Sequence, residues 1–170
     1  MAALTAQFLG APAKRGRHEV AEITFVTEGS RRIRVWRPVS GASFLSIDEK
    51  DGVLHEHFAI VLTDPDASNR VITVNLSTLR FPWTEDTSCV VDVDEVGPAL
   101  RARSYAFYAK AERRCADTLS YGIARNILRP KGPVSGNLLM RVRKGFLASP
   151  RADQDMAADV RRALSAWSAT

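Results

Sequence analysis

The chain has 170 residues, of which 45% are hydrophobic and 25% are charged, a balance that is typical of globular proteins and excludes general disorder. Its longest uncharged apolar run covers residues 58–62, whereas a membrane helix needs roughly 20 residues, so we expect no transmembrane span and no membrane partner. Cys89 and Cys115 form no C-x-x-C motif and lack histidines at ligand spacing. We therefore expect no metal site, no cofactor and a cytoplasmic location.

Charge divides the chain into three zones. Residues 1–37 carry seven Lys and Arg against three Asp and Glu, residues 38–96 three against eleven, and residues 97–170 fourteen against five, which gives net charges of +4, −8 and +9. The basic zone could attract phosphates or an acidic partner, although scattered arginines are also typical of a solvated surface. The acidic and basic zones could instead pair between subunits, which would make the chain chiefly an assembly element.

The start of the chain does not have the pattern of a secretory signal. Thr5 and Gln7 interrupt a weakly apolar stretch that has no basic segment ahead of it, so residues 1–22 are interpreted as a flexible N-terminal arm. No linker or repeat divides residues 23–170, which we predict to form one domain.

The middle of the chain predicts short strands at close spacing. The apolar run at residues 58–62 predicts a buried central strand, and the alternating run at 71–76 predicts its hairpin partner. A charged turn over residues 48–52 contains the Asp-Gly step that favours tight hairpins. In chain order, the predicted strands cover residues 23–26, 32–35, 44–47, 58–62, 71–76, 89–93 and 104–109.

Past Lys110 the pattern changes to helix. Ser135 could cap one helix, and Ser149-Pro150 could begin a second. The apolar stripe of the second helix would be Met156, Val160, Leu164 and Trp167. We therefore predict a mainly β fold, a small antiparallel barrel followed by two α-helices over about residues 135–168.

Four segments between His57 and Ala111 follow one another in the order HFAIVLTDP, VITVNLST, DTSCVV and RSYAFY. This part of the chain resembles the PemK/MazF-type growth-inhibitor toxins and their bacterial and phage relatives. The resemblance implies a compact SH3-like barrel with helical additions that is usually a homodimer. It also implies metal-independent cleavage of single-stranded RNA, opposed by an antitoxin protein that blocks the RNA groove.

The resemblance also implies where a site would lie. The toxin strand that ends in a Ser/Thr pair beside the active site is similar to residues 74–78, which would place Ser77 and Thr78 in the site. The later catalytic arginine would be Arg101 or Arg103. In this hypothesis Thr78 orients the scissile phosphate and the arginine stabilises the phosphorane.

Cleavage of RNA without a metal requires a base for the 2′-hydroxyl proton and an acid for the leaving oxygen. His55 and His57 come just before the predicted central strand and would share a face if extended, so His57 could transfer the proton. The alternative is that one histidine caps a strand while the other is solvated. The toxins have Arg-Pro where this chain has Glu56-His57. The alternative function is therefore a non-catalytic barrel that binds protein or nucleic acid.

Three further groups could bind RNA. Arg101 and Arg103 could clamp a phosphate with Ser104, or could be solvated on an edge strand. Tyr105 and its aromatic neighbours could stack unpaired bases, although aromatics at strand spacing are often core. The third group, in the first predicted helix, is expected to supply a polyanion docking surface and consists of Arg141, Arg143 and Lys144.

Overall fold

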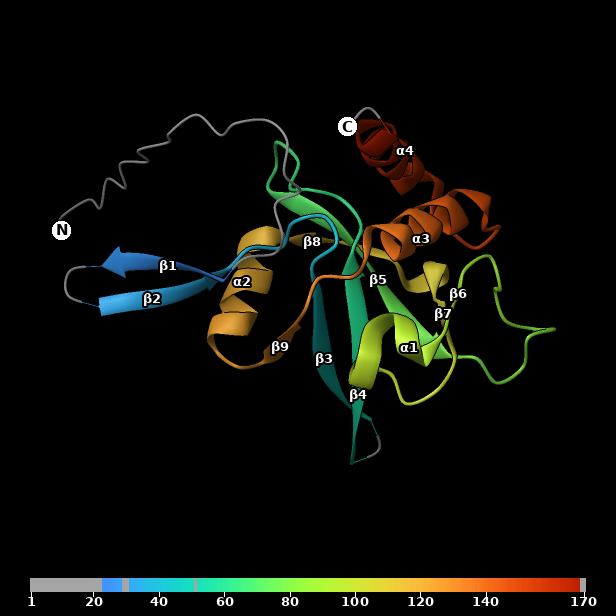
Figure 1. Ribbon diagram of the computed structural model, residues 1–170, viewed down its shortest axis with the longest axis horizontal. Coiled ribbons are helices and arrows are strands. Elements are labelled where there is room, and N and C mark those ends of the chain that lie inside the picture. Colours follow the sequence, from blue (N-terminus) through green and yellow to red (C-terminus); the bar gives the residue numbers. More distant parts are fainter. Residues whose placement is uncertain (1–22, 29–30, 51, 169–170) are drawn as a thin grey trace.

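The computed structural model describes residues 23–28, 31–50 and 52–168, so the arm expected over residues 1–22 lies outside the described part of the chain. Figure 1 shows a central sheet with helices around it and a separate hairpin at one side. The strands are β1 (Ile23–Glu28), β2 (Arg31–Trp36), β3 (Ser43–Lys50), β4 (Val53–Val61), β5 (Arg70–Thr78), β6 (Val90–Val91), β7 (Ser104–Ala106), β8 (Glu112–Cys115) and β9 (Leu128–Lys131). The helices are α1 (Val93–Val96), α2 (Ala116–Ala124), α3 (Gly136–Ala148) and α4 (Gln154–Ser168), with short 3-10 helices η1 (Gly97–Ala99) and η2 (Tyr108–Lys110).

Seven strands form the central sheet in the order β6-β7-β5-β4-β3-β9, and β8 also pairs with β5. Every pairing in this sheet is antiparallel, as predicted. The fold is therefore mainly β with helices. The outer strands β6 and β9 are not paired with each other in the described part of the chain, so the sheet is open and the predicted closed barrel is not seen.

Helices cover both faces of the open sheet, which explains the unbroken apolar run of β4. Phe58 and Ile60 belong to a core cluster with residues of α3 and α4, whereas Ala59 and Val61 belong to a second cluster with residues of α2. A strand directs successive side chains to opposite faces, so a strand that is covered on both sides needs apolar residues at every position. The two layers of helix bury both faces without closure of the sheet.

The end of β3 and the start of β4 differ from the sequence predictions. β3 runs to Lys50, which lies opposite Val53, so residues 48–50 of the expected turn over residues 48–52 belong to a strand. His55 and His57 lie within β4 and not before it, because this hairpin extends the strand. The predicted hairpin of β4 with β5 is confirmed.

The strands expected at residues 89–93 and 104–109 are also shorter than predicted. Asp92 ends β6 because its side chain and that of Glu95 form a capping box that starts α1. β7 ends before η2. Along β5, Leu76 lies opposite Ala106 of β7, and Thr73 lies opposite Glu112 of β8. The chain between Ala106 and Glu112 is longer than the stretch of β5 that it faces, and the extra residues form the 3-10 helix η2.

The first predicted helix begins as expected, since the Ser135 hydroxyl accepts a hydrogen bond from the backbone N–H of Leu138, 3.2 Å away. The second begins later than predicted. Ser149 instead ends α3, with its N–H bonded to the carbonyl of Gly145 at 2.8 Å. The Asp153 carboxylate accepts the N–H of Asp155 at 2.8 Å in the first turn of α4. The region just past Lys110 is not only helical, because β8 and β9 flank α2.

The strands predicted at residues 23–26 and 32–35 are confirmed as β1 and β2, which form a separate antiparallel two-stranded sheet, the N-terminal hairpin, with Ile23 opposite Trp36. The Trp36 ring is buried beside Phe44 of β3, with ring centroids 5.9 Å apart. This contact connects the end of the hairpin to the α2 side of the central sheet.

Candidate anion-binding site

The structure separates two of the residues proposed for RNA cleavage. Phe58 of β4 lies opposite Leu76 of β5, and both belong to the core cluster under α3 and α4. Because side chains alternate along a strand, His57 lies on the opposite face, toward α2, while Thr78 shares the face of Leu76. His57 and Thr78 therefore do not meet in one groove.

The two candidate arginines are also separated. Residues 101–102 form a bend and Arg103 precedes β7, so the period-two spacing that would place Arg101 and Arg103 on one strand face does not apply. The Arg101 side chain is 94% exposed, and its guanidinium lies 4.0 Å from the carboxylate of Glu56. The Arg103 Nε atom lies 3.1 Å from the carboxylate of Asp92. Only Arg103 lines the pocket described next.

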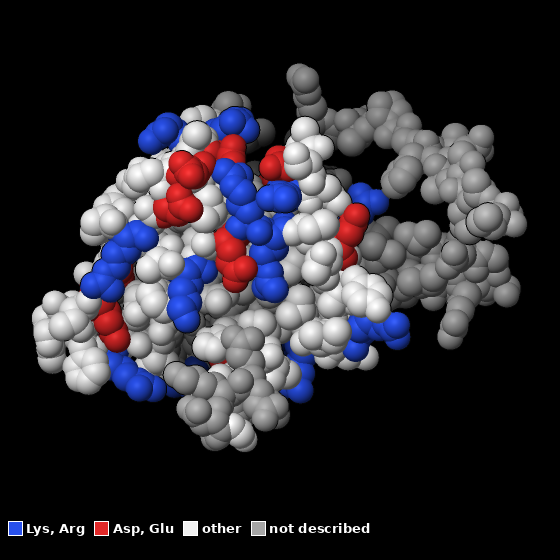
Figure 2. Space-filling view, turned by 180° about the vertical axis from the view of Figure 1, so that it is seen from behind, with Lys and Arg blue, Asp and Glu red and all other residues white. Residues whose placement is uncertain are grey.

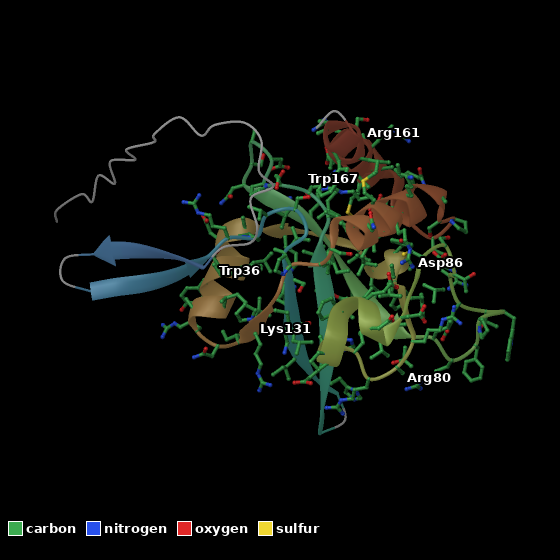
Figure 3. The ribbon with its side chains drawn as sticks, in the orientation of Figure 1. Trp36, Arg80, Asp86, Lys131, Arg161 and Trp167 are labelled. Carbon is green, nitrogen blue, oxygen red and sulfur yellow. The ribbon has the colours of Figure 1, made fainter. Side chains whose placement is uncertain are left out.

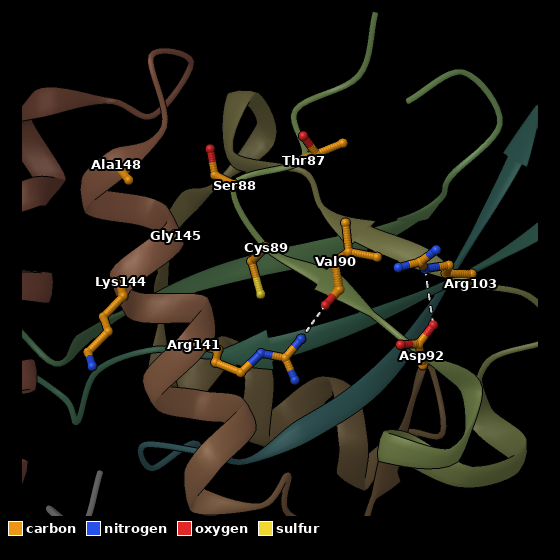
Figure 4. A pocket seen from close by; sticks show the side chains of 10 residues that line it. All are labelled: Thr87, Ser88, Cys89, Val90, Asp92, Arg103, Arg141, Lys144, Gly145 and Ala148. Atoms are coloured by element: carbon orange, nitrogen blue, oxygen red, sulfur yellow. Dashed lines mark hydrogen bonds and ion pairs between the residues drawn. The ribbon is translucent and has the colours of Figure 1, made fainter. Parts of the chain in front are cut away.

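A pocket of about 450 Å³ lies between α3 and β6, and three of the residues that line it are basic (Figure 4). Arg141 and Lys144 come from α3, where a spacing of three residues places them on one helix face, and Arg103 comes from the segment before β7. The other lining residues are Thr87, Ser88, Cys89, Val90, Asp92, Gly145 and Ala148. This arrangement is suited to an anion.

Gly145 allows α3 to approach β6 closely enough to form this pocket. A Cβ atom at this position would lie 2.3 Å from the Tyr108 hydroxyl, 2.8 Å from Cys89 Cβ and 2.9 Å from the carbonyl oxygen of Ser88. The Tyr108 hydroxyl donates a 2.8 Å hydrogen bond to the carbonyl of Val142, one turn earlier in α3. Burial raises the pKa of Tyr108 and that of Cys89, so both are neutral and form a fixed wall.

Arg141 is held at the edge of the pocket by two contacts. Its guanidinium forms an ion pair with Glu95 and donates a hydrogen bond to the carbonyl oxygen of Val90. The Glu95 carboxylate also accepts the backbone N–H of Asp92, 3.0 Å away. Helix α1 therefore orients Arg141, and Figure 4 shows the Arg141 and Arg103 contacts side by side.

Arg143 does not belong to the docking surface that was predicted for it. It is 2% exposed, and its guanidinium donates to the carbonyl oxygen of Leu62 through Nε and Nη2 at 2.8 and 2.7 Å. It also donates to the carbonyl of Ala163 and to the Ser40 hydroxyl. Burial lowers the pKa of Arg143, while the charge of Asp64 acts in the opposite direction. Arg143 connects α3 to β4 and α4.

The remaining candidate residues lie around the ends of β5 and β7. Tyr105 is 5% exposed, so its ring is covered and not presented to a base. The Ser104 hydroxyl is buried and donates to the carbonyl of Ala102 at 2.9 Å. Ser77 lies opposite Tyr105 and shares the face of His57 by alternation. None of these three residues lines the pocket.

Part of the charge asymmetry along the sequence is balanced by ion pairs within the fold. Glu56 of the acidic zone contacts both Arg101 and Arg129, at 4.0 and 3.1 Å. Asp92 and Glu95 pair with the two arginines of the pocket. The face in Figure 2, seen from behind, likewise shows Lys and Arg side chains next to Asp and Glu and not one continuous basic patch. Ion pairs within one chain are therefore an alternative to the proposed pairing of the acidic and basic zones between subunits.

Comparison of the chain with protein-family models, with curated proteins and with solved structures finds no match. Among the described residues, no group of three or more His, Cys, Asp or Glu side chains could hold a metal ion. None of the described helices is long and apolar enough to cross a membrane.

Sequence reasoning missed one feature beside the pocket. Residues 79–88 connect β5 to β6, and two residues of this segment, Thr87 and Ser88, line the pocket. The same segment exposes Phe81 and Trp83. The sequence signal for this feature was a tryptophan beside a proline in a loop. A tryptophan outside strands and helices is not covered by the packing of such elements, so its exposure could have been expected.

Proposed function

We propose that this chain is a PemK/MazF-like binding module for single-stranded RNA, with the phosphate groups bound in the pocket between α3 and β6. The observation that carries the proposal is that Arg103 lines the same pocket as Arg141 and Lys144, from which it is distant in the sequence. Guanidinium groups bind phosphate oxygens through paired N–H donors, and lysine binds them as a point charge. The pocket thus has the chemistry that a polyanion backbone needs.

The ion pairs already present at the pocket leave room for a phosphate. The side chains of Arg103 and Asp92 are 64% and 56% exposed, and such exposed pairs contribute only about 0–1 kcal/mol. A phosphodiester can therefore replace the carboxylate at low cost. Lys144 is exposed and forms no ion pair within the described residues, so its charge is available.

Binding is better supported than cleavage. The residues assigned to proton transfer and to orientation of the phosphate, His57 and Thr78, lie on opposite faces of the sheet. Arg101 faces Glu56, outside the pocket. A general base must come within hydrogen-bond reach of the proton it removes, and these residues have no common point of approach.

The similarity to the toxins supports the proposal in one respect. The segments that carry it lie on β4, β5, β6 and β7, and each of these strands is adjacent to another of the four in the sheet. The same proposal includes three further points. The open sheet is related to a PemK/MazF-like barrel, the chain forms a homodimer, and an antitoxin protein is its partner.

Charge reversal at Lys144 tests the phosphate pocket. We expect Lys144→Glu to weaken binding of a fluorescent single-stranded oligouridylate, measured by anisotropy at several salt concentrations. Loss of one phosphate contact lowers the slope of log K against log salt by about 0.7 for a single strand. Arg161→Glu is the matched control, because Arg161 is exposed on α4 and does not line the pocket.

Equal weakening by the two charge reversals would contradict the pocket and indicate a diffuse electrostatic attraction. The cleavage alternative is tested in the same samples by incubation with EDTA and analysis of the RNA ends. Products with cyclic phosphates that disappear in Arg101→Ala would favour the toxin activity over the binding module.

A further inference from the structure

The segment between β5 and β6 presents two large aromatic rings to solvent. Trp83 is 80% exposed and Phe81 is 53% exposed, and their ring centroids lie 5.9 Å apart with an interplanar angle of 62°. Large aromatic side chains are normally covered, because each one buries a large apolar area when it packs. Two of them exposed on one loop therefore require an explanation.

Hydrogen bonds at the start of the loop hold these rings in place. The Glu85 carboxylate accepts the backbone N–H groups of Arg80 and Phe81 at 2.9 and 3.1 Å. The carbonyl of Phe81 in turn accepts the N–H groups of Thr84 and Glu85 at 2.9 and 3.0 Å. The loop is thus closed on itself around residues 81–85, and the rings extend from an ordered turn.

The other end of the loop is attached to the end of α3. Asp86 is 7% exposed and accepts hydrogen bonds from the N–H of Ser88, at 3.0 Å, and from the hydroxyls of Ser88 and Ser149. The Arg151 guanidinium donates to the carbonyl of Thr84 at 2.7 Å. Figure 3 labels Arg80 and Asp86 near the two ends of this loop. A loop ordered in advance loses little entropy when it binds.

We infer that Phe81 and Trp83 form a stacking platform for the unpaired bases of an RNA strand whose phosphates occupy the adjacent pocket. This inference rests on the proposed function and names the part of the ligand that the loop contacts. Thr87 and Ser88 belong to the loop that carries the rings, and they also line the pocket together with Arg103, Arg141 and Lys144, so the loop leads from the rings to the pocket. Aromatic rings beside cationic side chains are the usual means of binding single strands without sequence preference.

The charges of the loop favour a nucleic acid over an apolar protein surface. Both of its carboxylates are turned to donors of the protein: Glu85 to backbone amides and Asp86 to amide and hydroxyl groups. The cationic side chains of Arg80 and Arg151 are exposed beside it. The other large hydrophobic residues that are exposed in the described part of the chain, Val93, Tyr121 and Ile127, lie outside this loop, so the two rings do not belong to a broad apolar patch.

Two ligands that differ only in their bases test the inference. Binding of a short fluorescent oligoadenylate and of an abasic ribose-phosphate oligomer of the same length is measured by anisotropy for the parent protein and for Trp83→Ala. We expect Trp83→Ala to weaken oligoadenylate binding about tenfold and to leave abasic binding unchanged, because stacking on one aromatic ring contributes about that much. Trp83→Phe should retain most of the affinity, since it keeps a ring.

Tyr121→Ala is the matched control, because Tyr121 is 57% exposed on α2, on the opposite side of the sheet. It should change neither affinity. Oligoadenylate should also quench tryptophan fluorescence in the parent and much less in Trp83→Phe, since Trp36 is 2% exposed and Trp167 is partly buried against the core cluster.

The outcomes separate this inference from the proposed function. A parent protein that binds neither oligomer overturns both. A parent that binds both oligomers equally, with affinity lost in Lys144→Glu, keeps the phosphate pocket and overturns the stacking platform. Unchanged RNA binding in Trp83→Ala combined with loss of self-association by gel filtration also overturns it and assigns the rings to a protein contact.

Discussion

Arg141 and Arg143 lie two residues apart in α3 and have opposite environments. Arg143 is 2% exposed and saturated with carbonyl and hydroxyl acceptors from β4, α4 and the segment before β3. Arg141 is exposed at the pocket, with Lys144 on the same helix face. The helical period divides one basic run into a buried structural cation and a surface group, so the number of basic residues overstates the charge that a ligand meets. The four predictions below run from the largest expected effect on stability to the smallest, and the first and the last test this division.

Arg143→Ala should have the largest effect. It would leave the carbonyl oxygen of Leu62 without its side-chain donor and open a cavity beside α3, at a cost of about 3 kcal/mol in the free energy of unfolding. Arg141→Ala truncates an arginine on the pocket side of α3 and should lower the free energy of unfolding by less than about 1 kcal/mol. Urea denaturation measures both, and equal costs would contradict the division of α3 into two sides.

Gly145→Ala should come next, because the added methyl group would contact the Tyr108 hydroxyl and the Ser88 carbonyl. Insertion of one methyl group into a packed contact costs about 1–3 kcal/mol. Tyr108→Phe removes the atom of closest approach, so the double variant should recover part of this loss in a double-mutant cycle of unfolding free energies. If the unfolding free energies of the two substitutions are strictly additive, the added methyl group is accommodated by movement of atoms other than the Tyr108 hydroxyl.

Asp86 should give the loop a pH-dependent stability. Burial raises its pKa, but hydrogen bonds from Ser149 and Ser88 and the charge of Arg151 outweigh this and hold the pKa below its ordinary 3.8. A carboxylate with a lowered pKa in the folded state contributes stability that is complete above about pH 4 and is lost as pH falls through the folded pKa. Asp86→Asn should therefore remove about 1 kcal/mol at pH 7 and flatten the dependence of the unfolding free energy on pH below about pH 4. If the unfolding free energy of the variant falls with decreasing pH as steeply as that of the parent, this prediction is wrong.

Lys144→Ala should have the smallest effect on stability, within about 0.5 kcal/mol, because the side chain is exposed and forms no ion pair among the described residues. Its effect on RNA binding should nevertheless exceed that of Arg143→Lys measured under conditions where both variants are folded. Thermal unfolding and anisotropy on the same samples make the comparison. A large loss of stability would place Lys144 on the structural side of α3.

Some parts of the site could be predicted from local pattern. The basic residues of α3 and the Ser135 cap were found because a helix repeats a short pattern that the sequence displays directly. Arg143 was assigned to the wrong side of α3 because its charge was given more weight than its helical position, although Val142 and Phe146 already marked the buried face. Burial of an arginine depends on acceptors from β4 and α4, and no local pattern includes them.

Other parts depended on contacts across the sheet. His57 and Thr78 could each be placed on a strand, yet whether they face one another depends on the register of β4 against β5, and one residue of register moves a side chain to the other face. Arg101 and Arg103 were expected on one strand face, and the bend at residues 101–102 removed the basis for that expectation.

The sequence by itself determined the strand-rich middle of the chain, the buried run at residues 58–62 and the first terminal helix, because alternation, continuous apolarity and capping act over a few neighbouring residues. Only the tertiary structure decided that the sheet stays open under helices on both faces, that residues of the acidic and basic zones pair within one chain, and that Arg103 lines one pocket with Arg141 and Lys144. These outcomes depend on which distant segments pack together. Packing is decided by the shape and charge of whole surfaces, and no short stretch of sequence contains that information.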